Sequence, residues 1–173
     1  AAGAFALLTL VSGTLPAYAA RAGPAAPAQV ATPAATISPT ESAALQFMRE
    51  EEKLAHDVYV ALYAKWNLQI FNNIAASEQK HTDSILTLLN RYGVSDPAAG
   101  MPAGVFTNPD LQALYTTLVA QGSVSVVEAL KVGAAIEEID ILDLKTHIAE
   151  TTKPDILRVD LGGRRVNATV VAA

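Results

Sequence analysis

The chain has 173 residues, which is enough for one domain with a buried hydrophobic core and an extension. Its formal net charge of -5 and its pI of about 5.1 argue against a nucleic-acid-binding protein, in which a basic surface is expected. Cysteine is absent, which excludes disulfides, thiolate metal sites and iron–sulfur clusters, so any bound metal has to be held by carboxylate and imidazole groups.

The N-terminal segment has the pattern of an export signal. An apolar run over residues 4–11 is followed by small residues around 17–19, typical of the hydrophobic region and cleavage site of a signal peptide. The run is shorter than the ~20 residues that span a bilayer. We therefore predict a partial signal peptide over residues 1–19, cleaved near Ala19, and a secreted or periplasmic protein with no stable membrane insertion after cleavage. Residues 20–37 are rich in Ala and Pro and predict a flexible linker.

Two long helices are predicted after the linker. Ser38 and Glu41 form a capping box with Pro39 at the first helical position, which predicts a helix from there to about Trp66. A second helix is expected from about residue 68 to 92, because Gly93 then provides a helix stop.

The second half of the chain is also predicted to be helical. The Asn-Pro pair at 108–109 opens a short helix over residues 110–120, and Ser125 with Glu128 forms a second capping box at the start of a long helix to about residue 151. A further helix starts at Pro154 and is broken by the glycine pair at 162–163. We expect a helical bundle over residues 38–160 and an irregular tail over residues 161–173.

Each of the three long helices carries an apolar stripe that is interrupted by ionisable residues. The predicted stripes are Leu45, Met48, Glu52, Ala55, Tyr59 and Leu62; Ile74, Glu78, His81, Ile85 and Leu88; and Val126, Leu130, Gly133, Glu137, Asp140, Leu144 and His147. Carboxylates are rarely buried unless they are paired or bind a metal, so these positions require an explanation.

A metal site is the simplest explanation for the acidic positions. Glu78 and His81 form a Glu-x-x-His motif, which places a carboxylate and an imidazole one turn apart on the same helix face. We expect Glu52, Glu78, His81 and Glu137 to converge, with Asp140 one turn beyond Glu137. Oxygen-rich ligation with one imidazole suits iron or manganese, and zinc is a further candidate.

Three alternatives remain open at this stage. The run of three glutamates at 50–52 is of a kind that is usually solvated, and Glu51 could face inward in place of Glu52. Tyr59 either hydrogen-bonds a ligand carboxylate or is plain core. If no metal is bound, the bundle would instead be an interaction or ligand-binding module of the cell envelope.

Three blocks of the chain resemble a known family. EEKLAHDVY (residues 51–59), NIAASEQKH (73–81) and VGAAIEEIDI (132–141) are similar to the ferritin-like domain of unknown function 2202, over about residues 40–159. The resemblance implies an all-α, ferritin-like up–down four-helix bundle with a short extra helix, and a di-iron type of site with Glu52, Glu78, His81 and Glu137 as ligands. The resemblance brings no established reaction; if the site is active, we expect redox chemistry of a di-iron oxidase or peroxidase type, or a role in iron handling.

The C-terminal part departs from the family pattern. Such domains continue through the last helix to a Ser-Arg-Asn-His-Leu-like segment, whereas this chain has Gly-Gly-Arg-Arg at 162–165. We therefore expect the fourth long helix to be truncated. Because neither Glu nor His follows Pro154, a weakened or mononuclear site is predicted. The expected partners are metal ions, and a homodimer is left open.

Overall fold

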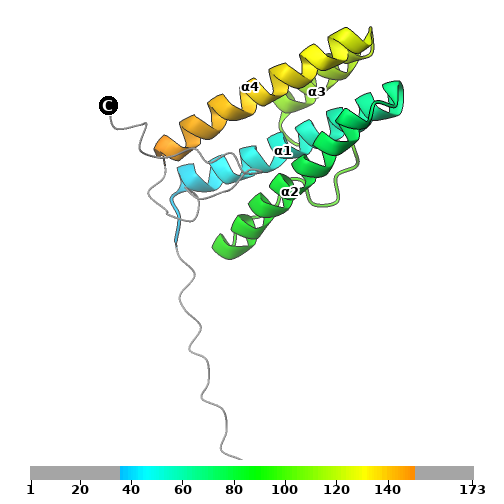
Figure 1. The fold of residues 1–173 in the computed structure, drawn as a ribbon. Helices are drawn as coiled ribbons and strands as arrows, with labels where there is room; N and C mark the ends of the chain where they lie inside the picture. The colour runs from blue at the N-terminus through cyan, green and yellow to red at the C-terminus, as the bar shows by residue number, and fades with distance from the viewer. Residues whose placement is uncertain (1–35, 151–173) are drawn as a thin grey trace, which may run out of the picture. The chain divides into compact units, whose positions relative to one another are not determined.

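The computed structural model describes residues 36–150, without the side chains of 143, 144 and 147–150. This part of the chain is helical, with the order α1 (Pro39–Trp66), α2 (Gln69–Tyr92), α3 (Pro109–Gly122) and α4 (Val126–Glu150), and contains no strand (Figure 1). The all-α class is therefore confirmed. The predicted signal peptide, most of the linker, the helix after Pro154, the tail and the side chain of His147 lie outside the described residues.

The ends of α1 are where the sequence predicts them. The Ser38 N–H donates to Glu41 Oε2 at 2.8 Å and the Glu41 N–H donates to Ser38 Oγ at 3.1 Å, so both halves of the capping box are present. At the other end Asn67 adopts a left-handed conformation (φ 52°) and its N–H donates to Tyr63 O. This residue and Leu68 form the short connection to α2, which gives an antiparallel helix pair.

The remaining helix ends use the expected polar and glycine signals. Gly93 ends α2 with φ 66°, and Asn108 Oδ1 accepts the N–H groups of Asp110 and Leu111 at the start of α3. The N–H of Glu128 donates to Ser125 Oγ at 3.1 Å at the start of α4. The predicted helix bounds agree with the structure to within about two residues.

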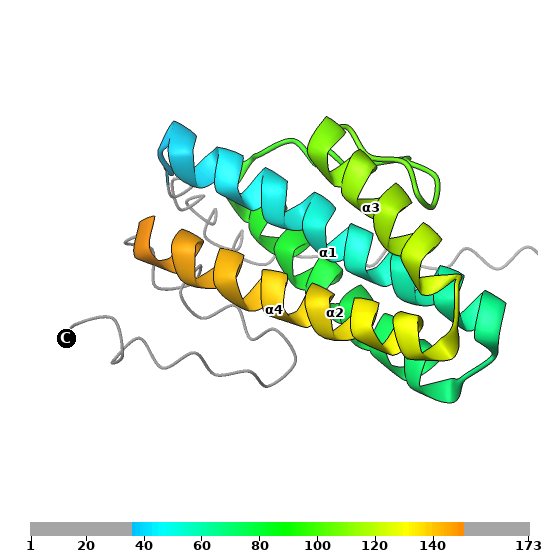
Figure 2. The same ribbon diagram turned by 90° about the horizontal axis from the view of Figure 1, so that it is seen from above.

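The first helix is the centre of the bundle. It contacts α2, α3 and α4, whereas α2 and α4 do not contact each other over the described residues. Figures 1 and 2 show that α2 and α4 both run antiparallel to α1 and flank it. All six residues of the predicted α1 stripe are buried. Side chains of α1 between α2 and α4 therefore face a space that is bounded by three helices.

The predicted stripe of α4 is partly wrong. Leu130, placed inside by the sequence pattern, is 50% exposed, whereas Ala129, Val132 and Ile136 are buried. The helix is turned so that these three residues meet the bundle through α1 and α3, with which α4 packs. Leu130 is left at the edge of the space between α4 and α2, because no described element covers it there.

Charged residues on one side of α1 fasten the loop between α2 and α3. Arg49 pairs with Asp96 through two contacts, Nε to Oδ1 at 3.1 Å and Nη2 to Oδ2 at 3.2 Å. Asp57 accepts the Gly104 N–H at 2.8 Å and contacts Lys53 Nζ at 2.6 Å. Much of the polar sequence around residue 53 therefore serves to hold this loop.

None of the helices over the described residues is both long and apolar enough to span a membrane.

Candidate metal centre

Three of the predicted ligands meet between α1 and α2. Glu52 comes from α1, and Glu78 and His81 lie one turn apart on α2, with one ligand atom of each residue within 4.8 Å of the others. His81 Nδ1 lies 2.8 Å from Glu78 Oε2 and 3.3 Å from Glu52 Oε2. The three residues are 4%, 1% and 3% exposed in chain order, so water does not compensate their charges. The Glu-x-x-His motif thus places its carboxylate and imidazole side by side on one face of α2, as the sequence predicts.

The hydrogen-bonding capacity of this group is not satisfied. Glu52 Oε2, Glu78 Oε2 and His81 Nε2 are buried and form no well-directed hydrogen bond. The Nδ1 atom carries at most one hydrogen, which cannot serve two carboxylates at once. A buried polar atom without a partner costs about 1–3 kcal/mol, and more when it is charged. A cation bound between these three residues would remove that cost for the two carboxylate oxygens.

The three residues also perturb one another's protonation. Burial raises the pKa of the Glu52 carboxyl, and the nearby His81 opposes this rise. Burial by itself would lower the pKa of His81, but the hydrogen bonds and charges of Glu52 and Glu78 outweigh it and raise the pKa to about 9. The metal-free centre therefore holds a proton on the imidazole at neutral pH, facing both carboxylates.

The glutamate run before this site is buried throughout, so the solvated alternative is wrong. Glu50, Glu51 and Glu52 are 4%, 7% and 4% exposed. Successive helical residues point about 100° apart, so the three side chains meet different neighbours. Glu50 accepts hydrogen bonds from Thr107 Oγ1 at 2.8 Å and from the Asn108 N–H at 3.2 Å, at the start of α3. Glu52, and not Glu51, belongs to the group with His81.

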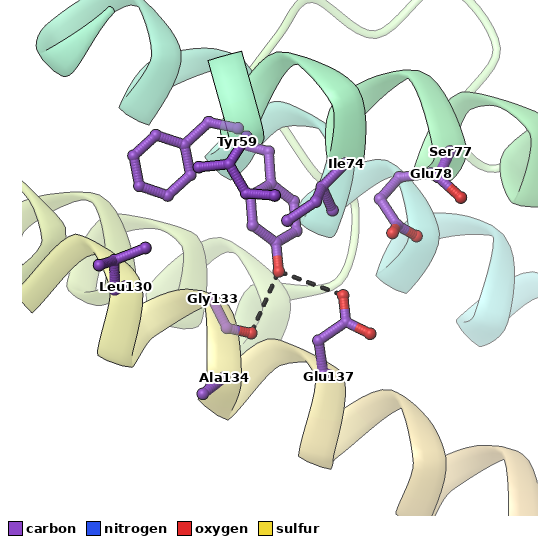
Figure 3. Close-up of a pocket in the computed structure, with 10 residues that line it drawn as sticks. Tyr59, Ile74, Ser77, Glu78, Leu130, Gly133, Ala134 and Glu137 are labelled. Atoms are coloured by element: carbon purple, nitrogen blue, oxygen red, sulfur yellow. Dashed lines mark hydrogen bonds between the residues drawn. The ribbon is translucent and has the colours of Figure 1, made fainter. Parts of the chain in front are cut away.

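The candidate residues of α4 lie beside this group. Figure 3 shows Glu137 and Glu78 on the same pocket, with the Tyr59 hydroxyl between the helices. The hydroxyl lies 3.1 Å from Gly133 O and 3.2 Å from Glu137 Oε1. Glu137 and Asp140 do not belong to the group of ligand atoms within 4.8 Å, and their role as ligands stays a prediction.

Tyr59 is suited to donate a hydrogen bond to a carboxylate. It is 1% exposed, and burial together with the charge of Glu137 raises the pKa of its phenol strongly. The charges of Glu78 and Asp140 act in the same direction. The phenol therefore keeps its proton at any physiological pH. The hydrogen bond expected between Tyr59 and a candidate ligand carboxylate is present.

Gly133 lies on the predicted inner stripe of α4, and its role in the contact with Tyr59 was not predicted from the sequence. A Cβ atom at this position would lie 3.3 Å from Tyr59 Cε1 and 3.4 Å from Tyr59 Oη, closer than most such contacts. The absence of a side chain lets the tyrosine reach the α4 backbone. A glycine inside a long predicted helix is a signal of such a close approach.

Comparison with known proteins gives a family without an assigned activity. The family model described as "uncharacterized protein domain (DUF2202)" matches residues 41–165. The uncharacterized protein MJ0754 of Methanocaldococcus jannaschii is 52% identical over 124 residues, which cover 72% of this chain and 67% of the relative. The crystal structure of hypothetical protein MJ0754 from Methanococcus jannaschii is similar with a TM-score of 0.71, over 72% of this chain and 71% of that chain.

Proposed function

Because the chain belongs to the DUF2202 family of ferritin-like domains, we propose that it binds a divalent metal ion, iron or manganese, through Glu52, Glu78 and His81. One observation carries this proposal: three buried residues converge, and Oε2 of both carboxylates lacks a hydrogen bond beside the imidazole. Two carboxylate oxygens and one imidazole nitrogen form a donor set that fits either metal, and zinc as well.

The residues around the metal have distinct parts in this proposal. Glu52 and Glu78 would neutralise the charge of the ion, and His81 would bind it through Nδ1 as the deprotonated imidazole. Tyr59 holds Glu137 at the edge of the centre, where Glu137 and Asp140 are candidates to bind a second ion. A bound iron or manganese ion would supply redox chemistry, so an oxidase-like, peroxidase-like or iron-handling role belongs to the proposal.

Metal binding is tested by titrating chelator-treated protein with Mn²⁺ and, without oxygen, with Fe²⁺, followed by elemental analysis. We expect at least one ion per chain for the wild type. Removing a ligand in Glu78→Gln should weaken binding at least about tenfold, since even residues that only orient ligands contribute about 10–100-fold. The matched control is Glu138→Gln, on the exposed face of α4. Equal affinity of the wild type and Glu78→Gln would contradict the proposal.

Thermal unfolding separates a metal site from a purely structural acidic cluster. If the cluster has no ligand, Glu78→Leu removes a buried charge and should stabilise the fold or leave it unchanged. If the cluster binds metal, added ion should raise the Tm of the wild type in proportion to the logarithm of its concentration, and Glu78→Leu should lose this response. We expect the second result. A variant that melts above the wild type with and without metal would favour the metal-free bundle.

Export is proposed on the sequence pattern of residues 1–19 alone. It is tested by mass spectrometry of the protein isolated from the envelope and the cytoplasm of its source organism. A mature chain that starts at Ala20 in the envelope fraction is expected, and an uncut chain in the cytoplasm would contradict export.

A further inference from the structure

A pocket of about 400 Å³ lies between α2 and α4, and Tyr59 of α1 extends its hydroxyl between these two helices (Figure 3). Its outer walls are apolar, with Ile70 and Ile74 from α2 and Leu130 and Ala134 from α4. Ile70 and Leu130 are 48% and 50% exposed, which is unusual for large apolar side chains that face each other across a groove. The volume lies at the lower end of the range for small-molecule sites, about 300–1,000 Å³.

The inner end of the pocket reaches the candidate metal centre. Glu78 lines the pocket and is also one of the three residues that converge on the proposed metal. It is 1% exposed, and its Oε2 atom has no hydrogen bond. Glu137 lines the same end from α4, and Ser77 lies beside Glu78 on α2. A molecule in the pocket would therefore have one end at the metal centre and its remainder along the apolar walls.

The polar groups at this end set the charge of the occupant. Glu78 and Glu137 offer carboxylate oxygens, and the Tyr59 hydroxyl already points its hydrogen towards Glu137 and the Gly133 carbonyl. Because the hydrogen of Tyr59 is already engaged, these groups, Ser77 apart, can only accept a hydrogen bond from a ligand. An anion would be repelled by the carboxylates. An ammonium ion would be attracted by them, but it would compete with the metal ion for the same carboxylates and lose its water in an apolar groove, so a neutral hydroxyl fits better beside a bound metal.

We infer that this pocket binds the substrate of the metal centre, and that the substrate class is a small, neutral, mostly apolar molecule with one hydroxyl group. The hydroxyl donates to the carboxylates at the inner end, and the apolar body lies between Ile70, Ile74 and Leu130. That the bound molecule is a substrate rests on the proposed function. Its binding to the pocket can be measured without metal.

The test is equilibrium dialysis of the full chain, with and without Mn²⁺, against two probes of the same shape. The neutral probe is 2-naphthol and the anionic probe is naphthalene-2-carboxylate. We expect 2-naphthol to bind at least about tenfold more tightly than the carboxylate, since like charge next to a buried carboxylate is strongly unfavourable. Equal binding of the two probes, or no binding of 2-naphthol, would overturn the assignment.

Two pairs of variants locate the binding. Ala134→Trp fills the pocket and should weaken 2-naphthol binding at least about tenfold, whereas Ala135→Trp, the exposed neighbour outside the pocket, should change it less than about twofold. Leu130→Ala removes a wall and should weaken binding about three- to tenfold. Its control is Leu142→Ala, on the same helix and similarly exposed at 55%, but outside the pocket.

The outcomes for pocket and metal are separate. The pocket assignment is supported if Leu130→Ala binds 2-naphthol more weakly but still binds metal, while Leu142→Ala keeps both. A wild type that binds metal but not 2-naphthol overturns the pocket assignment and leaves the metal proposal standing. A wild type that binds 2-naphthol in the expected pattern but no metal overturns the proposed function only. Equal effects of Leu130→Ala and Leu142→Ala would show that the probe binds elsewhere.

Discussion

Metal affinity at this centre should depend on pH over a range in which an ordinary histidine is already deprotonated. Burial lowers the pKa of His81, but Glu52 and Glu78 outweigh it and raise the pKa from 6.5 to about 9. A metal ion has to displace this proton, so the apparent affinity should rise about tenfold per pH unit until the pH approaches 9. Between about pH 6.5 and 8.5 the gain should be about 80-fold, against about twofold for a histidine of pKa 6.5.

The assay is competition between the protein and a chelating dye for Mn²⁺, corrected for the dye's own protonation. Glu52→Gln removes one of the two residues that raise the pKa of His81, so affinity should fall and the remaining pH dependence should become shallower. His56→Gln is the control, because His56 contacts Asp57 and lies outside the centre. A wild type whose affinity changes only about twofold over this range would refute the reasoning, because His81 would then not hold the proton.

Four further predictions concern stability without metal. The raised pKa of His81 contributes stability that is complete below pH 6.5 and is lost as the pH rises through about 9. The free energy of unfolding in urea should therefore fall by up to about 3 kcal/mol between pH 6 and pH 9.5. An unfolding free energy that does not change over this range would contradict the prediction. Glu50→Gln should cost about 2–3 kcal/mol because it disrupts several hydrogen bonds at the start of α3, whereas Glu138→Gln should cost almost nothing. Tyr59→Phe should cost about 1 kcal/mol of stability. Gly133→Ala should not stabilise the fold, although alanine has the better helix propensity, because the added methyl group crowds Tyr59. A Tm of Gly133→Ala above that of the wild type would disprove this crowding.

The helix bounds could be predicted because their signals are local. The Ser38–Glu41 capping box and Gly93 act within one turn of the backbone, so no knowledge of the tertiary structure is needed. The face that α4 buries could not be predicted in the same way. A pattern of apolar residues every three or four positions fits a stripe through Leu130 as well as one through Ala129 and Val132, and only the position of α3 decides between them.

For the candidate site, too, the local arrangement could be predicted and the tertiary one could not. The Glu-x-x-His motif fixes Glu78 and His81 relative to each other, and their spacing alone orients them towards a neighbouring helix. Which glutamate of α1 they meet depends on the rotation of α1 about its axis. That rotation is set by the loop after α2, through contacts such as those of Arg49 with Asp96, and these pairs are 47 residues apart in sequence.

Three buried carboxylates of α1, those of Glu50, Asp57 and Glu52, differ in their partners, and the contrast between them supports a cation at the centre. Glu50 accepts hydrogen bonds from Thr107 and Asn108. Asp57 accepts hydrogen bonds from Lys53 and Gly104. Burial by itself would raise the pKa of Asp57, but these donors and His56 outweigh it and lower the pKa. Burial has the opposite result at Glu52, whose pKa is raised. It shares a single imidazole with Glu78, whereas Glu50 and Asp57 each accept hydrogen bonds from several donors. A bundle that needed these acids only for packing would gain stability by replacing Glu78 with leucine. A metal ion would supply the additional positive charge that the two carboxylates require at this point, beside a pocket that leads to it.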